Sequence, residues 1–440
     1  MLLKKLKDFL MLPMCSNIPP KKIIQVTSRE YKKFKKRYSE PVNTDGTSDN
    51  TILSQNVQLS MNFQKTHLNN NVLVVENGKQ SDIVKQNILQ ANSNFVVVDP
   101  EGELLKETRD FLEKQGYKIK TIDFISPEES DGYNPFCYFK DAYDVNSFIG
   151  DLIQTNKSDK NTEPFWEDAK IALLQAIFYY LTNHGVEEEK RLSSVTKILK
   201  DCLSVEKEIS KKAKSDADYF ENETDYGIKS KLDTVYETIG IKKPDDFGYK
   251  AYSDFKKCGN ANVRYSVIND CLHLLSFLEI LEVEQITSRD TLDLTTFGNT
   301  KQAIFIIIPR NNNQYRPVIA MLYEQMYNIL HDYVAESTDG KCYAFQTRFF
   351  INGFQNIGYI HHFCRKIVPA RIYDMSYFII MSNTEDLKLL YGEEDALEIM
   401  ANCDSLVFYD NDTITSTYYK CFVLLRRTQV FVDNILRKEF

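Results

Sequence analysis

The sequence lacks any long apolar segment. No window approaches the roughly 18 to 20 apolar residues in a row that a membrane-spanning helix needs, and the longest runs, AIFIII (303–308) and YFIIM (377–381), have the length of strands. With 16 glycines and 12 prolines in 440 residues the chain is not collagen-like, and 43% hydrophobic residues exclude a wholly disordered protein. The composition predicts a soluble globular protein with two or three domains, or one large domain with an insertion.

The sequence also lacks a metal-binding pattern. Its nine cysteines never stand at the two-residue spacing that is typical of zinc sites and redox pairs, which favours reduced thiols. Of the six histidines, only His361 and His362 are close in sequence. Adjacent side chains point in different directions in a helix and in a strand. We therefore expect no metal site.

Excess positive charge is confined to the start of the chain. Residues 1–38 hold 11 Lys and Arg against 2 Asp and Glu, whereas the other 402 residues hold 43 against 60, a net charge of −17. The first residues, MLLKKLKDFLMLPM, predict a short amphipathic helix that either packs on its own domain or lies on an anionic membrane surface. KKIIQVTSREYKKFKKRY (21–38) completes this basic amphipathic arm, either as a solvated helix or as a contact for phosphates or lipid headgroups. Residues 39–50, rich in Ser, Asp, Asn, Gly and Pro, predict a linker.

Beyond residue 50, short apolar runs alternate with helical patterns. The runs NVLVV (71–75), FVVV (95–98) and KIKTIDFI (118–125) predict buried parallel strands joined by helices. Residues 151–294 carry helical spacing instead, as in FWEDAKIALLQAIFYYL. Strand patterns return at 303–308, 347–351, 377–381 and 405–409. The pattern predicts one α/β domain, residues 51–150 and 295–440, with a mainly parallel sheet and an all-α domain inserted at 151–294.

A strand, a loop and a helix at residues 71–90 form the setting of a phosphate-binding loop. Gly78 and Lys79 match the end of such a loop, but the earlier glycine is missing. Gln80 stands where the Mg²⁺-binding hydroxyl belongs, and Ser81 follows one position later. Alone, this motif is a weak indication of a nucleotide site.

The sequence from about residue 20 to 420 resembles the TraG-type coupling proteins of conjugative type IV secretion systems. The resemblance is collinear, and it is carried by SDGYNPF (130–136), FWEDA (165–169), FVVVDPEGELL (95–105), ITSRDTLDL (286–294), FFINGFQNIGYI (349–360) and NCDSLVFYDNDTITSTYY (402–419). It implies a RecA-like P-loop NTPase fold with an inserted all-α domain, and an activity of ATP-driven DNA translocation by a hexamer. It also implies N-terminal transmembrane helices before the basic arm, and we expect this chain to begin after them.

The chain departs from the family pattern where the chemistry would take place. After NVLVV the Walker A loop is about three residues shorter, and Glu76 puts a negative charge where phosphates would lie. In the Walker B segment the family has Asp-Glu, which support Mg²⁺ and polarise the attacking water. Asn352 and Gly353 stand at these positions.

Three further positions also depart from the family pattern. The lysine of the family's Asp-Pro-Lys-Gly-Glu is replaced by Glu101, and the nucleotide-sensing glutamine corresponds to Ser382. Of two paired arginines, Arg371 matches the first and Tyr373 replaces the second.

These departures lead to the hypothesis of a catalytically degenerate coupling-protein-like component without ATP or Mg²⁺ as cofactors, acting by binding or scaffolding. The expected partners are an active coupling-protein paralogue, relaxosome proteins or secretion-channel proteins, while DNA contact stays open. We expect a cytoplasmic location, peripheral at most at the inner face of the membrane. Two alternatives remain: an active ATP-dependent DNA translocase that uses Lys79, Ser81 and an imported carboxylate such as Asp99, and a folded remnant with no present role.

Overall fold

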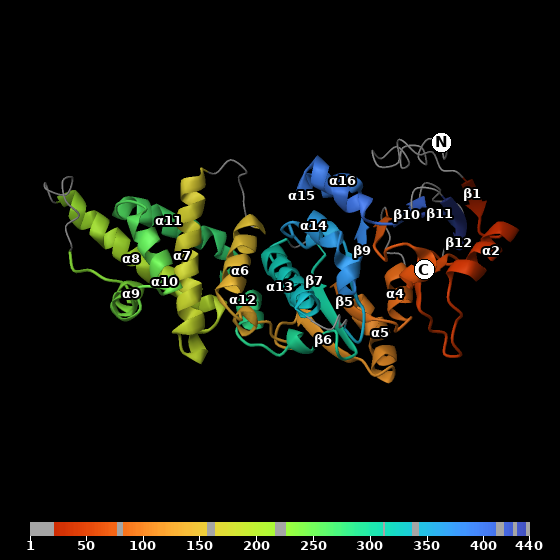
Figure 1. The fold of residues 1–440 in the computed structure, drawn as a ribbon, viewed down its shortest axis with the longest axis horizontal. Helices are drawn as coiled ribbons and strands as arrows, with labels where there is room; N and C mark the ends of the chain where they lie inside the picture. The colour runs from red at the N-terminus through yellow and green to blue at the C-terminus, as the bar shows by residue number, and fades with distance from the viewer. Residues whose placement is uncertain are drawn as a thin grey trace.

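A large sheet forms the centre of one half of the protein (Figure 1). The computed structural model describes residues 22–76, 82–155, 163–215, 226–310, 313–336, 343–410, 418–425 and 429–436. Across these ranges, no helix combines the length and the apolar character that crossing a membrane requires. The strands lie side by side in the order β1 (Lys22–Gln25), β12 (Gln429–Leu436), β11 (Tyr418–Leu425), β10 (Ser405–Asp410), β4 (Val72–Val75), β9 (Met375–Met381), β8 (Thr347–Asn352), β5 (Asn94–Pro100), β7 (Gln302–Ile308) and β6 (Lys118–Asp123).

The seven strands from β10 to β6 are all parallel to their neighbours, whereas β11 is antiparallel to β10 and β12. Their side chains enter two cores, because successive residues of a strand face opposite sides. Val72 and Val74 belong to one core and Leu73 to the other. Burial on both faces explains the continuous apolar runs in the sequence, and the predicted mainly parallel α/β sheet is confirmed.

Helices cover both faces of this sheet. The core that contains Val72 and Val74 also takes side chains from α2 (Arg29–Tyr38), α4 (Ile83–Ile88) and α5 (Glu103–Lys114). On the opposite face lie α13 (Arg316–Ala335), α14 (Phe363–Ile367), α15 (Thr384–Tyr391) and α16 (Glu393–Ala401). The architecture is therefore three-layered, with the sheet in the middle.

Between β6 and β7 the chain forms a helical region that extends away from the sheet (Figure 1). Its helices are α6 (Ala142–Thr155), α7 (Pro164–Asn183), α8 (Leu192–Ser215), α9 (Lys231–Lys242), α10 (Phe247–Lys257), α11 (Ala261–Leu274) and α12 (Leu281–Thr287). Pro164 starts α7, where a missing N–H has no cost. The first helix, α6, packs on α13 and so joins this region to the sheet.

A small hairpin of β2 (Asn50–Ile52) and β3 (Gln58–Ser60) fixes the position of α4. The Asn87 side chain on α4 donates to the Ile52 carbonyl at 2.8 Å and accepts from its N–H at 2.9 Å. Arg348 on β8 is fully buried and donates to Thr51 at 3.2 Å and to Asn87 at 3.3 Å. The helix that follows the predicted phosphate loop is therefore held at its far end.

The start of the described chain differs from the prediction. Residues 22–38, predicted as part of a separate basic arm, add β1 and α2 to the sheet half, because β1 pairs with β12 over four residues. The predicted linker at 39–50 is packed at its two ends, whereas residues 41–46 are exposed. Asn50 is buried and exchanges two hydrogen bonds with Glu40. Ser48 donates to the side chain of Gln90, two residues after α4, at 2.6 Å. The polar side chains of residues 39–50 bind one another and the backbone. A segment of this kind has the same composition as a solvated linker, so composition alone did not distinguish the two.

Candidate functional site

The carboxyl ends of four parallel strands meet at one edge of the sheet. β4 and β8 flank β9, and β5 follows β8. The Glu76 N–H donates to the Met381 carbonyl at 2.9 Å, and the Gly353 N–H donates to the Ile380 carbonyl at 3.1 Å. Neighbouring strands lie about 4.8 Å apart. The residues after β4, β8 and β9 therefore come together at a single place.

The predicted phosphate-loop residues Gly78, Lys79, Gln80 and Ser81 lie outside the described residues. The residue before them, Glu76, is only 8% exposed. By strand alternation, its side chain points to the same face as Val72 and Val74, which is the face covered by α4. A buried carboxylate therefore lies beside the position that the resemblance assigns to phosphate.

Asn352 and Gly353 end β8 at this edge. Asn352 is 7% exposed and alternates with Phe350, so it faces the same side as Glu76. Gly353 has a φ of +78°, the left-handed region that favours glycine. A Cβ there would lie 3.0 Å from Nδ2 of Asn356. The strand end supplies one neutral amide and a backbone conformation suited to glycine.

Asp99 lies on the neighbouring strand β5, one residue beyond the last paired position of β5 and β8. It has no exposed surface and accepts the N–H groups of Leu104 at 3.0 Å and Leu105 at 2.7 Å. Burial raises the pKa of this carboxyl to about 6. Both oxygens therefore bind the first turn of α5, and the side chain has a structural role in the described state.

Glu101, which replaces the family's lysine, lies in the turn between β5 and α5. It has a φ of +66°, and its carboxylate accepts the Arg310 N–H at 3.1 Å. The Arg310 guanidinium in turn lies 3.1 Å from the Glu103 carboxylate at the surface. The charges around this turn bind one another.

The two sensor-like positions are far apart. Ser382 is exposed directly after β9, beside Glu76 and Gly353. Arg371 precedes the same strand, so about 20 Å of extended chain separates the two residues. The Arg371 guanidinium lies 3.7 Å from the centre of the Phe63 ring. The structure places Ser382 at the carboxyl ends of the strands and Arg371 at their amino ends.

A cation that the sequence did not single out lies near the strand end. Arg316, in the first turn of α13, donates from Nη2 to the Gln355 carbonyl at 2.6 Å, and partial burial lowers its pKa. It holds the loop that follows Gly353. Its motif, Tyr-Arg-Pro before an apolar helix, carries no signal that distinguishes it from any helix start.

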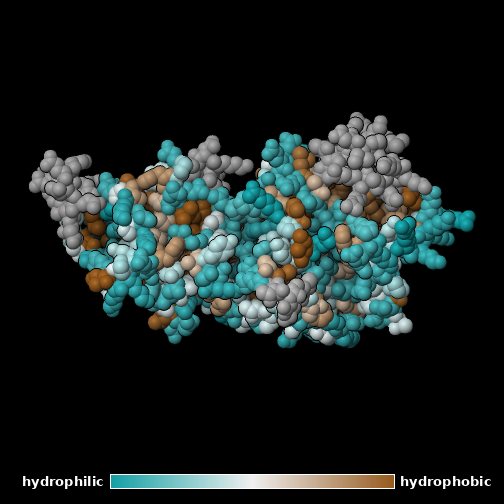
Figure 2. All heavy atoms as spheres, in the orientation of Figure 1, coloured by the Kyte–Doolittle hydropathy of each residue, from teal (hydrophilic) through white to brown (hydrophobic). Residues whose placement is uncertain are grey.

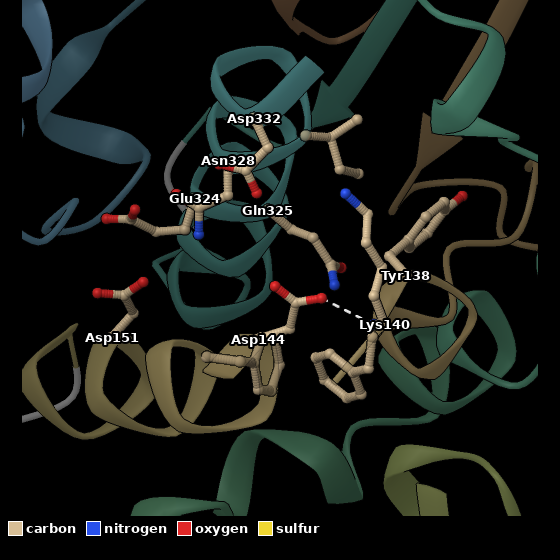
Figure 3. A pocket seen from close by; sticks show the side chains of 11 residues that line it. Tyr138, Lys140, Asp144, Asp151, Glu324, Gln325, Asn328 and Asp332 are labelled. Atoms are coloured by element: carbon tan, nitrogen blue, oxygen red, sulfur yellow. Dashed lines mark hydrogen bonds between the residues drawn. The ribbon is translucent and has the colours of Figure 1, made fainter. Parts of the chain in front are cut away.

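The structure also contains a small cavity between α6 and α13, with polar and apolar lining residues, that the sequence did not predict (Figure 3). Its volume of about 30 Å³ holds about two water molecules. Its polar lining residues are Tyr138, Lys140, Asp144, Asp151, Glu324, Gln325, Asn328 and Asp332. The Asp144 carboxylate accepts the Lys140 N–H at 2.7 Å, as the dashed line shows. Four carboxylates face this junction between the helical region and the sheet half.

One group of potential metal ligands exists among the described residues. The Sγ of Cys364 and carboxylate oxygens of Asp395 and Glu398 lie within 4.8 Å of one another. Burial raises the pKa of the Cys364 thiol, which opposes the thiolate that a metal needs. The prediction that His361 and His362 diverge is wrong, because they lie in an irregular turn before α14 and their rings stack at 3.8 Å.

Comparison with known proteins decides the family. The protein family described as type IV secretory system conjugative DNA transfer matches residues 75–420 of the chain. The chain belongs to this family. No curated protein sequence matches it. Family membership indicates that the chain is a coupling-protein-like component of conjugative DNA transfer with partners in that system.

Solved structures of the coupling protein TrwB show the same fold. The structures titled bacterial conjugative coupling protein TrwBdeltaN70 in complex with sulphate, and plasmid coupling protein TrwB in complex with ADP and Mg²⁺, each superpose with a TM-score of 0.56 at 13% identity. Each match covers 84% of this chain and 86% of the TrwB chain. This confirms the predicted RecA-like P-loop NTPase-type fold for this member of the conjugative DNA transfer family.

Proposed function

We propose that this chain is a catalytically degenerate coupling-protein-like component of a conjugative type IV secretion system, which acts by binding or scaffolding and does not hydrolyse ATP. One observation carries the proposal. At the end of β8, where the resemblance implies two carboxylates, the chain has the amide of Asn352 and a left-handed Gly353. A neutral amide contributes no charge toward Mg²⁺, and glycine has no group that could polarise an attacking water.

The neighbouring residues do not fit a Mg²⁺-bound nucleotide in the manner that the resemblance implies. Mg²⁺ is held by carboxylates together with phosphate oxygens. The Asp99 oxygens bind the N–H groups of α5, so an imported carboxylate would first have to leave that helix. Glu76 would repel a phosphate group at its side. These contacts favour the degenerate component over the alternative of an active translocase with an unorthodox P-loop.

The finer parts of the proposal concern partners and location. We assign as partners an active coupling-protein paralogue, relaxosome proteins or secretion-channel proteins, which are the classes of protein that a non-hydrolysing member of such a system can bind. We place the chain in the cytoplasm, peripherally at the inner face of the membrane. The net charge of −17 outside residues 1–38 weakens any contact of the main body with DNA phosphates.

The test is equilibrium binding of a fluorescent ATP analogue with Mg²⁺, followed by phosphate release. Wild type is compared with Lys79→Ala and with Lys85→Ala, which removes a lysine on α4 that pairs with Glu107 at 2.9 Å. The proposal expects no Mg²⁺-dependent phosphate release from any of the three proteins. Release that is lost in Lys79→Ala and kept in Lys85→Ala would overturn it and establish the active translocase.

A further inference from the structure

Helix α2 carries an exposed cationic face. Six of its ten residues are Lys or Arg and one is Glu. Four of these cations, Arg29, Lys32, Lys33 and Lys36, follow the spacing i, i+3, i+4 and i+7 and therefore share one side of the helix. All four are exposed. The helix thus presents a compact row of positive charge to its surroundings.

The opposite side of α2 is fixed to the sheet. Tyr31 is buried, and its hydroxyl donates to the Asn56 carbonyl at 2.6 Å. The Phe431 ring of β12 lies 5.4 Å from the Tyr31 ring and 4.7 Å from the Phe34 ring. Because these aromatic contacts set the rotation of the helix, its cationic side is held outward.

The cationic side of α2 has no anionic partner within the described part of the chain. None of its four aligned cations forms an ion pair with a described residue. Arg29 and Lys33, and likewise Lys32 and Lys36, are like charges four residues apart, an arrangement that destabilises a helix. An external anionic surface would relieve this repulsion, so the arrangement favours a bound partner over a merely solvated face.

The position of α2 suits a flat partner. It lies beside β1 at one end of the long axis of the molecule, and α8 and α9 lie near the other end (Figure 1). In the same orientation, the surface at the α2 end, on the right, is strongly hydrophilic (Figure 2). Contact there would leave the helical region far from the surface that α2 touches.

We propose that the cationic side of α2 binds the anionic phosphate headgroups of a lipid bilayer. This inference rests on the proposed peripheral location and names the surface that would provide it. Two observations favour lipid over nucleic acid. The sequence before α2 begins MLLKKLKDFLMLPM, and a bilayer interface accepts apolar residues next to lysines. The remaining 402 residues carry a charge of −17, which would repel a long polyanion passing along the protein.

The experiment is flotation of the full chain with phosphatidylcholine vesicles, with and without phosphatidylglycerol. The variant Lys32→Gln/Lys33→Gln/Lys36→Gln keeps helix-forming residues at exposed sites. Its control is Lys207→Gln/Lys242→Gln/Lys243→Gln, which removes three exposed lysines from α8, α9 and the residue after α9. Both variants change the net charge equally.

Wild type and control should bind only the anionic vesicles, and binding should be lost at about 1 M salt, where screening is nearly complete. The α2 variant should bind about 100-fold more weakly. Equal binding by all three proteins, or equal loss in the control, would overturn the proposal. The proposal would also be overturned if the α2 variant lost binding to duplex DNA in a mobility-shift assay but kept its binding to anionic vesicles. Lipid binding is measured without ATP, so its failure is distinct from a failure of the degenerate-component proposal.

Discussion

Glu324 on α13 and Lys366 on α14 form a largely buried ion pair on the face of the sheet that α13 to α16 cover. Burial lowers the pKa of Lys366 to about 8, and the nearby charge of Asp151 opposes that shift. Asp151 comes from α6 and lies 2.7 Å from the His361 ring nitrogen. The Lys366 ammonium contacts the Oε2 atom of Glu324 directly. These charges connect the first helix of the helical region to the sheet half.

Removing one member of the pair should be costly. Lys366→Met would leave the Glu324 carboxylate buried without a counter-charge, and we expect the free energy of unfolding to fall by about 4 kcal/mol. Glu324→Leu/Lys366→Met removes both charges and should recover most of that loss, because apolar side chains pack in their place. Urea unfolding followed by circular dichroism measures both variants.

Lys200→Met provides the matched control for this pair. Lys200 lies 2.6 Å from Glu279, and both side chains are more than half exposed. Such a surface pair contributes less than about 1 kcal/mol. A double variant that is as unstable as Lys366→Met would contradict the burial argument.

Asp99 should make stability depend on pH. Its pKa is raised to about 6 in the folded protein from an ordinary value of 3.8. The folded state therefore binds more protons over this interval, so the contribution of Asp99 is present below about pH 4 and is lost as the pH rises through 6. From pH 3 to pH 7 the loss amounts to about 3 kcal/mol in the free energy of unfolding.

Asp99→Asn removes the titrating group and can still accept one N–H bond from α5. Urea unfolding at several pH values should show wild type losing stability relative to this variant as the pH rises. Glu113→Gln changes an exposed carboxylate in the last turn of the same helix, and it should keep the wild-type slope. A constant difference between Asp99→Asn and wild type would refute the raised pKa.

Tyr133 ties the segment SDGYNPF to α13. The Tyr133 hydroxyl is fully buried and donates to Oε1 of Gln325 at 2.7 Å, and Nε2 of Gln325 donates to the Pro135 carbonyl at 3.1 Å. Tyr133→Phe would leave that amide oxygen without its donor, and we expect a loss of about 1 to 2 kcal/mol. Tyr143→Phe, at a 75% exposed position, should leave the urea midpoint unchanged. Equal midpoints for both variants would contradict this account.

The sheet was predictable because its central strands are buried on both faces. Apolar runs such as FVVV and AIFIII, when helical segments separate them, are typical of buried parallel strands. The strand β1 was not predictable in the same way. Its four residues stand among lysines, and its partner β12 lies about 400 positions later, so only the folded chain shows the pairing. Local sequence carries little information about such distant contacts.

The candidate site was predictable in position but not in its contacts. The strand pattern places Glu76, Asn352 and Ser382 together, since parallel strands end at a common edge. It could not show that Asp99 already binds α5. The pair of Glu324 and Lys366 left one overlooked signal, which is a glutamate inside the apolar helical pattern MLYEQMYNIL. A charge at a position expected to be buried implies a partner.

Gly353 sets a limit on restoring the Walker B carboxylates. Its φ of +78° is strained for any residue with a Cβ, and a Cβ would lie 3.0 Å from the Asn356 side chain. Asn352→Asp/Gly353→Glu should therefore lower the free energy of unfolding by about 1 to 2 kcal/mol through the backbone alone. Gly353→Ala should show most of this loss, since it introduces the same Cβ without a charge.

The doubly substituted protein should also gain no Mg²⁺-dependent phosphate release. Glu76 still lies buried at the neighbouring strand end, and the loop after it remains about three residues shorter than the family pattern. Two added carboxylates act only on a phosphate that is held in place, and the proposal expects the shortened loop to hold none. Phosphate release that appears in Asn352→Asp/Gly353→Glu, and disappears when Lys79→Ala is added, would show that the loop still binds ATP. In that case the substitutions at Asn352 and Gly353 alone would account for the loss of catalysis, and restoring these two residues would restore the activity.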